Sequence, residues 1–367
     1  MEVTCLNCGC PYPETGAPYC CPDCGGIFDF ASPLPREEIA SQRTLAMTDV
    51  TLGEGNTPLL WAEAFGRQVA FKCEYQNPTG SFKDRGTAAL VTFLKSRGVT
   101  EAVEDSSGNA GASFAAYAAR AGIRARVFVP ESASGPKRRQ IEMYGAELVP
   151  VAGPRSNAAE AVKKAISETR FLDTPRSEAK MGGENGFLAY ASHAYLPFNL
   201  PGYATIAGEI VAQLGGRVPG AVIVPAGQGG LLLGAWRGFV ALNPAGATRE
   251  APRMIGVQAA ACSPLVEQES KVKSRKSKVE GQTLAEGVRV ANPLRREAVR
   301  KAVEESGGWW VAVDEKEILP GRDALAKRGF YVEPTSALVW NALKENLPRL
   351  PDPVVVILTG SGLKFFG

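Results

Sequence analysis

The sequence is poor in histidine, in net charge and in long apolar runs. The single histidine, His193, excludes metal sites built from several imidazoles, and we interpret it as a packed side chain near a pocket wall. A net charge of +3 is too close to balance to indicate a nucleic-acid or anionic membrane partner. No apolar run reaches the length of a membrane span, and the N-terminus lacks the apolar core of a signal peptide. We therefore expect a cytoplasmic protein.

The 367 residues have an ordinary globular composition, 45% hydrophobic and 22% charged, and are long enough for two lobes with sizeable cores. Strand-like and helix-like patterns alternate along most of the chain, which predicts an α/β fold with parallel sheets and ligand loops beyond the carboxyl ends of the strands. We expect strands at 102–104, 126–129, 148–151, 221–224, 254–258 and 354–358, and helices at 90–97, 112–120, 137–144, 158–168 and 206–214.

Cysteines gather at the N-terminus: six of the eight lie in the first 24 residues. Cys5 and Cys8 form one Cys-x-x-Cys pair, and Cys21 and Cys24 form another after a gap of twelve residues. A glycine follows each pair and allows the tight turn around two thiolates. This spacing predicts a structural Zn²⁺ site in a zinc-ribbon-like module over residues 1–30, whose folding free energy the metal would supply.

Two further thiols, Cys10 and Cys20, stand beside this set, and Cys20 could replace Cys21 as a ligand. Disulfide pairing is the alternative, but it fits poorly with an intracellular protein. No lysine or arginine precedes Arg36, which favours a structural or docking role for the module over nucleic-acid binding.

A second signal is the segment Asn-Pro-Thr-Gly-Ser-Phe-Lys-Asp-Arg-Gly at residues 77–86. It combines turn formers with a helix start, for which Ser81 is a capping candidate. Lys83 would then lie beside the Phe82 ring and near a helix N-terminus, where burial and positive partial charge both favour the neutral amine. A neutral lysine amine can form a Schiff base with an aldehyde cofactor.

The segment closely resembles the pyridoxal-phosphate lysine segment of threonine synthases, which are fold-type II pyridoxal-phosphate enzymes like tryptophan synthase β chains and serine/threonine dehydratases. Gly-Glu-Gly-Asn-Thr-Pro-Leu at residues 53–59 is similar to a second threonine synthase segment. The resemblance, which covers about residues 52–364, implies pyridoxal 5′-phosphate as cofactor, with Lys83 and Phe82 at its site. It also implies a two-lobed tryptophan synthase β-like catalytic domain at 31–367, with a smaller lobe at about 87–190 inserted in the larger.

Three further segments match this family in order. In Ser106-Ser107-Gly108-Asn109-Ala110-Gly111, the resemblance assigns Asn109 to the phenolic oxygen of the cofactor. It assigns the carboxylate of the substrate to Ser106, Ser107, Ala110 and Gly111. The loop Gly227-Gln228-Gly229-Gly230-Leu231 follows an apolar strand and precedes an apolar helix, so its backbone amides suit a phosphate. The resemblance makes it the cofactor-phosphate loop and places the hydroxyl of Thr359 at the pyridine nitrogen.

One family position departs from the pattern. Threonine synthases carry an asparagine-serine pair and an arginine that are expected to hold the substrate phosphate. Aligned on Pro197 and Gly202, the arginine falls at Asn199, and Ser192 and His193 are the nearest counterparts of the pair. An arginine fork is the natural clamp for a phosphate dianion, so Arg85, Lys137 and Arg176 are substitute candidates.

The resemblance implies a carbon–oxygen lyase of the threonine synthase type, acting on a small-molecule amino-acid substrate in amino-acid biosynthesis. In such an enzyme O-phospho-L-homoserine loses its γ-phosphate and water adds at Cβ, giving L-threonine. Lys83 would act as general base and acid. Two alternatives stay open: another fold-type II reaction (cysteate-synthase-like replacement or serine/threonine dehydration), and a zinc-ribbon binding protein with an inactive catalytic part. The family also leaves a homodimer open.

Overall fold

The computed structural model describes residues 1–31, 33–40, 49–132, 135–153, 155–172, 188–243, 251–266 and 281–365. The chain divides into two compact units. Unit 1 comprises Met1–Ser32, Met47–Leu52 and Gly86–Asn199, and unit 2 comprises Pro33–Ala46, Gly53–Arg85 and Leu200–Gly367. Of the positions named above, Arg176 lies outside the described residues.

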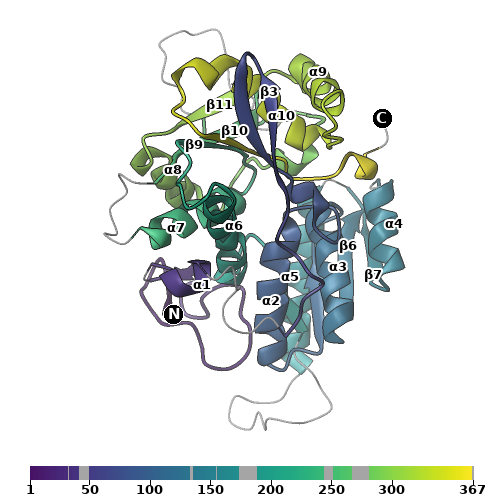
Figure 1. The fold of residues 1–367 in the computed structure, drawn as a ribbon. Coiled ribbons are helices and arrows are strands. Elements are labelled where there is room, and N and C mark those ends of the chain that lie inside the picture. The colour runs from purple at the N-terminus through teal and green to yellow at the C-terminus, as the bar shows by residue number, and fades with distance from the viewer. Residues whose placement is uncertain are drawn as a thin grey trace, which may run out of the picture. The chain divides into compact units, whose positions relative to one another are not determined.

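Unit 2 is built on a six-stranded sheet in the order β11-β10-β9-β12-β4-β3 (Figure 1). Its strands are β3 (Leu59–Ala64), β4 (Arg67–Lys72), β9 (Ala221–Pro225), β10 (Arg253–Ala259), β11 (Trp309–Val313) and β12 (Val354–Ile357). All neighbours pair in parallel except β3, which returns antiparallel to β4 through a tight turn at Phe65 and Gly66. Both turn residues have positive φ, as a two-residue hairpin of this kind needs.

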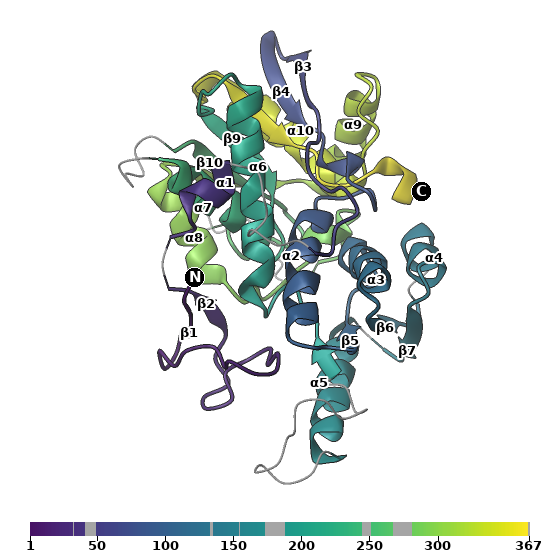
Figure 2. The ribbon, with the colours of Figure 1, turned by 60° about the horizontal axis from the view of Figure 1, so that its bottom comes forward.

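The helices of unit 2 are α1 (Arg36–Ala40), α6 (Leu200–Gln213), α7 (Gly230–Leu242), α8 (Arg296–Glu305), α9 (Glu315–Ala326) and α10 (Pro334–Asn346). Apolar side chains of α9 and α10 join those of the sheet in one core. Helices α6 and α7 lie side by side (Figures 1 and 2). Glycine allows this approach, because a Cβ at Gly238 would lie 2.3 Å from the carbonyl oxygen of Ala204.

Unit 1 holds a four-stranded parallel sheet in the order β7-β6-β5-β8. Its strands are β5 (Glu101–Glu104), β6 (Arg124–Pro130), β7 (Glu147–Val151) and β8 (Leu188–Tyr190), and its helices are α3 (Asn109–Ala121), α4 (Pro136–Met143), α5 (Arg155–Leu172) and most of α2 (Lys83–Ser96). The alanine-rich α3 is buried along most of its length and ends at Gly122, which adopts the left-handed conformation.

The N-terminal residues of unit 1 form an antiparallel pair of short strands, β1 (Val3–Cys5) and β2 (Phe28–Phe30), with cysteine-bearing loops between them (Figure 2). The predicted α/β class and parallel sheets are confirmed, and the antiparallel edge strand β3 is an element that the sequence analysis did not anticipate. Among the described helices, none is both long and apolar enough to cross a bilayer.

Candidate functional site

Lys83 is the first residue of α2 and so lies at a helix N-terminus, where the motif placed it. Its amine lies 5.0 Å from the centre of the Phe82 ring. The preceding turn needs glycine at position 80, where φ is +84° and a Cβ would lie 3.1 Å from Cε of Lys364. The backbone N–H of Phe82 donates to the carbonyl oxygen of Thr359 at 3.0 Å. The Lys83 segment is therefore held by main-chain pairing, which leaves little freedom to the start of the helix.

The expected capping role of Ser81 is wrong. Ser81 is fully buried, its backbone forms a bridge with Gly360, and its Oγ finds no hydrogen-bond partner within the described residues. The turn is closed instead by the Asp84 carboxylate, which accepts from N–H and Oγ1 of Thr79 at 2.7 and 2.6 Å. A buried hydroxyl without a partner two residues before Lys83 fits a place where a polar ligand group binds.

Thr359 follows the fully buried strand β12 and is 2% exposed. Its Oγ1 lies 2.8 Å from Oγ of Ser336, and Ser336 Oγ in turn accepts from the N–H of Gly360 at 2.8 Å. Ser336 thus fixes the Thr359 hydroxyl, and the neighbouring Thr335 Oγ1 accepts from the N–H of Gly287 at 3.0 Å. The Glu-Pro-Thr-Ser-Ala segment therefore supports the Thr359 region, a role that its sequence did not reveal.

The glycine loop links β9 to the N-terminus of α7 in unit 2. Gly229 has a φ of +81° and provides no side-chain cap for α7, so this helix N-terminus is suited to an anion. At Gly227 a Cβ would lie 2.7 Å from the carbonyl oxygen of Gly287, so the close approach requires glycine. The Gln228 side chain is used locally, because its Oε1 accepts from the N–H of Leu294 at 3.0 Å.

Tyr203 on α6 connects the glycine loop with the lysine segment, and the sequence analysis missed it. Its ring centre lies 5.4 Å from that of Phe82, and a Cβ at Gly230 would lie 3.4 Å from its Cε2. Lys83, Phe82, Thr359 and the loop 227–231 all belong to unit 2. An uncapped helix N-terminus, a glycine cradle, a fixed hydroxyl and a lysine amine fit the phosphate, ring and aldehyde of pyridoxal phosphate.

The turn at residues 106–111 lies in unit 1, after β5 and at the start of α3. Asn109 is the first helical residue, and Gly108 before it supplies no side-chain cap. Oγ of Ser106 accepts from the N–H of Gly108 at 3.3 Å, and a Cβ at Gly111 would lie 1.8 Å from the Ser106 carbonyl oxygen. The tight turn therefore leaves the N-terminus of α3 without a side-chain cap, which suits a carboxylate.

Ser192 and Asn199 shape a second turn of unit 1. Oγ of Ser192 accepts from the N–H groups of Ala194 and Tyr195 at 3.3 and 3.4 Å. Nδ2 of Asn199 donates to the carbonyl oxygen of His193 at 2.7 Å. Asn199 is 1% exposed, and its Oδ1 finds no hydrogen-bond partner in the part of the chain that the structure describes. That oxygen cannot bind an anion itself, because an amide oxygen only accepts hydrogen bonds.

His193 is a packed side chain, as interpreted from the sequence. Its Nε2 lies 2.9 Å from Thr87 Oγ1, which also accepts from Ser113 Oγ at 2.7 Å. Its Nδ1 lies 3.6 Å from Glu104 Oε1. The ring thus joins β5, α2 and α3 in the interior of unit 1.

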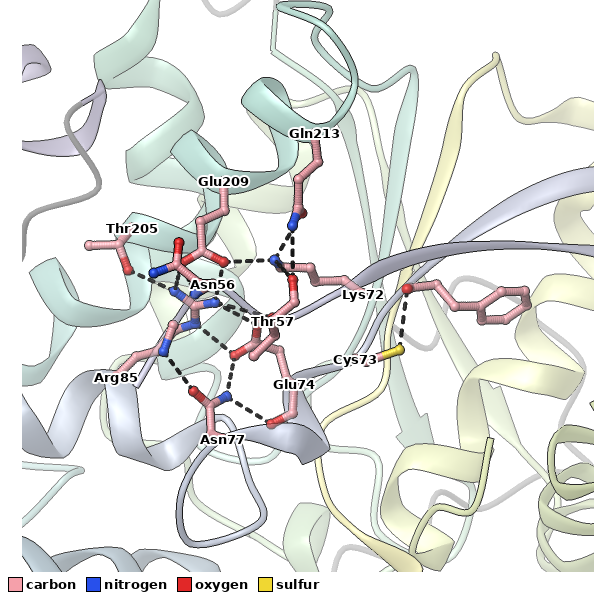
Figure 3. A network of polar contacts seen from close by, with 12 residues as sticks. Asn56, Thr57, Lys72, Cys73, Glu74, Asn77, Arg85, Thr205, Glu209 and Gln213 are labelled. Atoms are coloured by element: carbon pink, nitrogen blue, oxygen red, sulfur yellow. Dashed lines mark hydrogen bonds and ion pairs between the residues drawn. The ribbon is translucent and has the colours of Figure 1, made fainter. Parts of the chain in front are cut away.

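Arg85 is not available as a substitute phosphate clamp. It is 2% exposed, and all five of its N–H groups are engaged by Glu74, Glu209 and Thr205 (Figure 3). Burial alone would lower the pKa of Arg85, but the two carboxylates outweigh it and raise the pKa above its ordinary value. Lys137, the other candidate within the described residues, lies in the first turn of α4.

Four cysteine thiols converge at the N-terminus of unit 1. The sulfurs of Cys5, Cys8, Cys21 and Cys24 all lie within 4.8 Å of one another, and the contacts between them are 3.4 to 3.7 Å long. A tetrahedral zinc with Zn–S bonds of about 2.3 Å requires sulfurs about 3.8 Å apart. Cys21 rather than Cys20 belongs to this cluster. The four thiols therefore fit a zinc ion.

Each cysteine pair is closed by a backbone turn of the same form. The N–H of Gly9 donates to the carbonyl oxygen of Cys5, and the N–H of Gly25 donates to that of Cys21, both at 2.9 Å. Both glycines have positive φ, 74° and 72°, which a side chain would strain.

Aromatic rings bind this module to the rest of unit 1. The Tyr12 ring lies 4.6 Å from Phe28, 5.8 Å from Phe93 and 5.0 Å from Phe198, and Phe93 stacks on Phe198 at 3.5 Å. Such packing contributes about 0.5–1.5 kcal/mol per pair beyond buried area. Because Phe198 adjoins Asn199, the module supports the turn that carries a predicted substrate residue.

Comparison with known proteins agrees with this geometry. Residues 50–360 match the family model of the pyridoxal-phosphate dependent enzymes. The threonine synthase of Methanocaldococcus jannaschii is 34% identical over 99% of this chain and 93% of its own length. The threonine synthase of Synechocystis is 34% identical over 86% of this chain and 78% of its own length.

Solved structures show the same fold. A threonine deaminase from T.th. is 26% identical with a TM-score of 0.64, over 85% of this chain and 94% of that one. Maize serine racemase is 20% identical with a TM-score of 0.71, over 90% and 95% of the two chains. The chain therefore belongs to the family of pyridoxal-phosphate-dependent enzymes that includes the threonine synthases.

Proposed function

We propose that this protein is a threonine synthase, which converts O-phospho-L-homoserine and water to L-threonine and phosphate. The observation that carries the proposal is the placement of Lys83 at the first position of α2, with its segment paired to that of Thr359 in unit 2. Curated threonine synthases at 29–34% identity over most of the chain support the substrate class.

Each cofactor contact in the proposal uses a group with matching chemistry. Lys83 would bind the aldehyde carbon, the amides of Gly227–Leu231 would bind the phosphate, and Phe82 would contribute its ring to the same site. Asn109 would donate to the ring oxygen, and the Thr359 hydroxyl would serve the ring nitrogen. A neutral hydroxyl polarises that nitrogen only weakly, which favours elimination and replacement chemistry. When bound, pyridoxal phosphate supplies an electron sink for carbanion chemistry at the substrate.

The substrate contacts follow from unit 1. Ser106, Ser107, Ala110 and Gly111 bind the substrate carboxylate at the N-terminus of α3. Ser192 and Asn199 line the side that receives the phosphate-bearing end. The Lys83 amine would take and return protons at Cα and Cβ of the substrate. These assignments make Lys83 the one acid–base group of the reaction.

The proposal includes a structural zinc ion held by Cys5, Cys8, Cys21 and Cys24, supported by their sulfur separations. The ion closes residues 1–30 into the module that packs on Phe93 and Phe198 through Tyr12. A biosynthetic role further implies a cytoplasmic enzyme without nucleic-acid or membrane partners, and a homodimer that sedimentation equilibrium can test.

The deciding experiment is phosphate release from O-phospho-L-homoserine by the cofactor-loaded protein, with products identified by mass. We expect equimolar threonine and phosphate. The second candidate, a cysteate-synthase-like or serine/threonine dehydratase reaction, is favoured by the asparagine at position 199 in place of arginine. Turnover of O-phosphoserine, serine or threonine without turnover of O-phospho-L-homoserine would replace the first proposal by the second.

A further inference from the structure

Four charged side chains form a buried, electrically balanced cluster beside the lysine segment: Lys72, Glu74, Arg85 and Glu209 (Figure 3). Their side chains are 0%, 0%, 2% and 4% exposed. Figure 3 shows Arg85 between the two carboxylates, with Lys72 bound to Glu209 as well. The proposed chemistry uses none of these four groups directly.

The bonds in this cluster are short and directional. Arg85 donates from Nε and Nη2 to Glu74 at 2.7 and 2.8 Å, and from Nη1 and Nη2 to Glu209 at 2.6 and 2.7 Å. Nζ of Lys72 donates to Glu209 at 2.7 Å. Two forked pairs on one guanidinium fix its position in a plane, which a lysine ammonium cannot reproduce.

The cluster holds the elements that surround Lys83. Arg85 lies two residues after Lys83 in α2, and Glu209 lies in α6, whose other residues are uncharged. On the other side, Asn77 donates to Glu74 at 2.9 Å and accepts from the N–H of Gly55 at 2.9 Å. The turn before Lys83 and the helix that begins there are thus tied to the same carboxylate, that of Glu74.

Stability alone does not account for this arrangement. Removing four charges from water is costly, and well-packed apolar side chains of similar volume often stabilise a core equally well. Burial alone would raise the pKa of Glu209, but Arg85 and Lys72 outweigh it and lower the pKa to about 2. The carboxylates therefore remain charged over the working pH range, and the cluster keeps its directional bonds.

We propose that Arg85 is a positioning residue for Lys83: its two forked ion pairs, to Glu74 and Glu209, set the first turn of α2 so that the Lys83 amine stays at one place relative to Thr359 and the glycine loop. This inference rests on the proposed attachment of the cofactor to Lys83. Because all five N–H groups of Arg85 are engaged, it acts through Lys83 and not on the substrate.

The test compares two identical substitutions in the holoenzyme, Arg85→Lys and Arg67→Lys. Arg67 begins β4 at the opposite end from Lys72, and it binds the Leu347 carbonyl oxygen and the Asp352 carboxylate at the periphery of unit 2. Borohydride trapping with peptide mapping identifies the lysine that carries the cofactor. The rate at which hydroxylamine removes the cofactor, and kcat and KM for O-phospho-L-homoserine, report how well that lysine is held.

In Arg85→Lys we expect the cofactor on Lys83, faster removal by hydroxylamine and a kcat lower by about 100-fold, with KM little changed. Arg67→Lys should match the wild type in all three. Glu209→Gln keeps the Arg85–Glu74 fork, so it should change the same readouts in the same direction but less than Arg85→Lys does. It replaces Arg85→Lys as the test variant if that protein does not fold.

Two outcomes overturn separate statements. If the trapped cofactor of the wild type lies on a lysine other than Lys83, the proposed function loses its catalytic residue and the inference falls with it. If it lies on Lys83 but Arg85→Lys and Glu209→Gln behave like Arg67→Lys, the positioning role is wrong while the proposed function stands.

Discussion

The ion-pair cluster around Arg85 in unit 2 and the turns of unit 1 satisfy their polar groups to different degrees. Around Lys83, Arg85 and its neighbours bind one another until every N–H of the guanidinium is engaged. In unit 1, the buried Oδ1 of Asn199 finds no partner among the described residues. The residue that precedes α3 is Gly108, which has no side chain to cap the helix. The first arrangement fixes the start of α2, whereas in the second a buried amide oxygen has no partner and the N-terminus of α3 has no side-chain cap within the described residues.

The largest effect is expected from Lys83→Ala, which removes the amine that we propose binds the cofactor. Turnover of O-phospho-L-homoserine should fall by about 10⁴-fold or more, because both the cofactor link and the acid–base group are lost. Lys95→Ala, an exposed position in the last turn of the same helix, should keep wild-type turnover. Retained turnover in Lys83→Ala would show that Lys83 is not the catalytic residue.

Removing a thiol from the cysteine cluster tests how far unit 1 depends on its N-terminal module. Cys21→Ser should lower zinc content from about one ion per chain to near zero and increase hydrogen exchange around Phe198, because the module loses its closing ion. Cys20→Ser is the matched control and should keep its zinc. Equal metal content in the two variants would contradict the assignment of Cys21.

A third substitution measures how much the saturated ion pairs of unit 2 contribute to stability. Glu74→Gln leaves Arg85 with one charged partner in a dry interior, so unfolding by urea should require about 3–5 kcal/mol less free energy. The exposed pair of Arg67 and Asp352 offers a control, since Asp352→Asn should cost only about 0–1 kcal/mol. Similar losses at both sites would mean that burial does not distinguish the two pairs.

Acid should weaken the same cluster in a defined range. The pKa of Glu209 is about 2 in the folded chain against an ordinary 4.5, so the unfolded chain binds more protons between these values. Its contribution to stability is complete above pH of about 4.5 and declines as the pH falls towards about 2. Urea unfolding of Glu209→Gln should therefore depend less steeply on pH in this range than that of the wild type.

The smallest effect is expected at the unsaturated turn of unit 1. Asn199→Ala removes one hydrogen bond, to the His193 carbonyl oxygen, and should cost about 1 kcal/mol of stability. If the turn binds the phosphate-bearing end of the substrate, KM should rise more than kcat falls. An unchanged KM would remove Asn199 from the substrate contacts.

Local motifs made the chemistry predictable. The lysine motif, the two Cys-x-x-Cys pairs, the glycine loop and the strand–helix alternation are each set by neighbouring residues, so the sequence locates them. The chemistry expected of the lysine motif and the glycine loop came from their resemblance to the threonine synthases. The buried ion pair of Glu209 had a weaker signal in the sequence, because Glu209 is the sole charged residue of α6. A lone carboxylate in an apolar helix predicts a buried partner.

What the sequence by itself determined was the position of the lysine motif, the four clustered thiols and the α/β class, because these depend on residues close together in the chain. Only the tertiary structure decided that Arg85 is engaged by Glu74 and Glu209, 11 and 124 positions away, and is closed to the substrate phosphate. It also decided that Ser336 holds the hydroxyl of Thr359, 23 positions away. Propensity describes what a side chain can bind nearby, whereas burial sets which distant partner it must find.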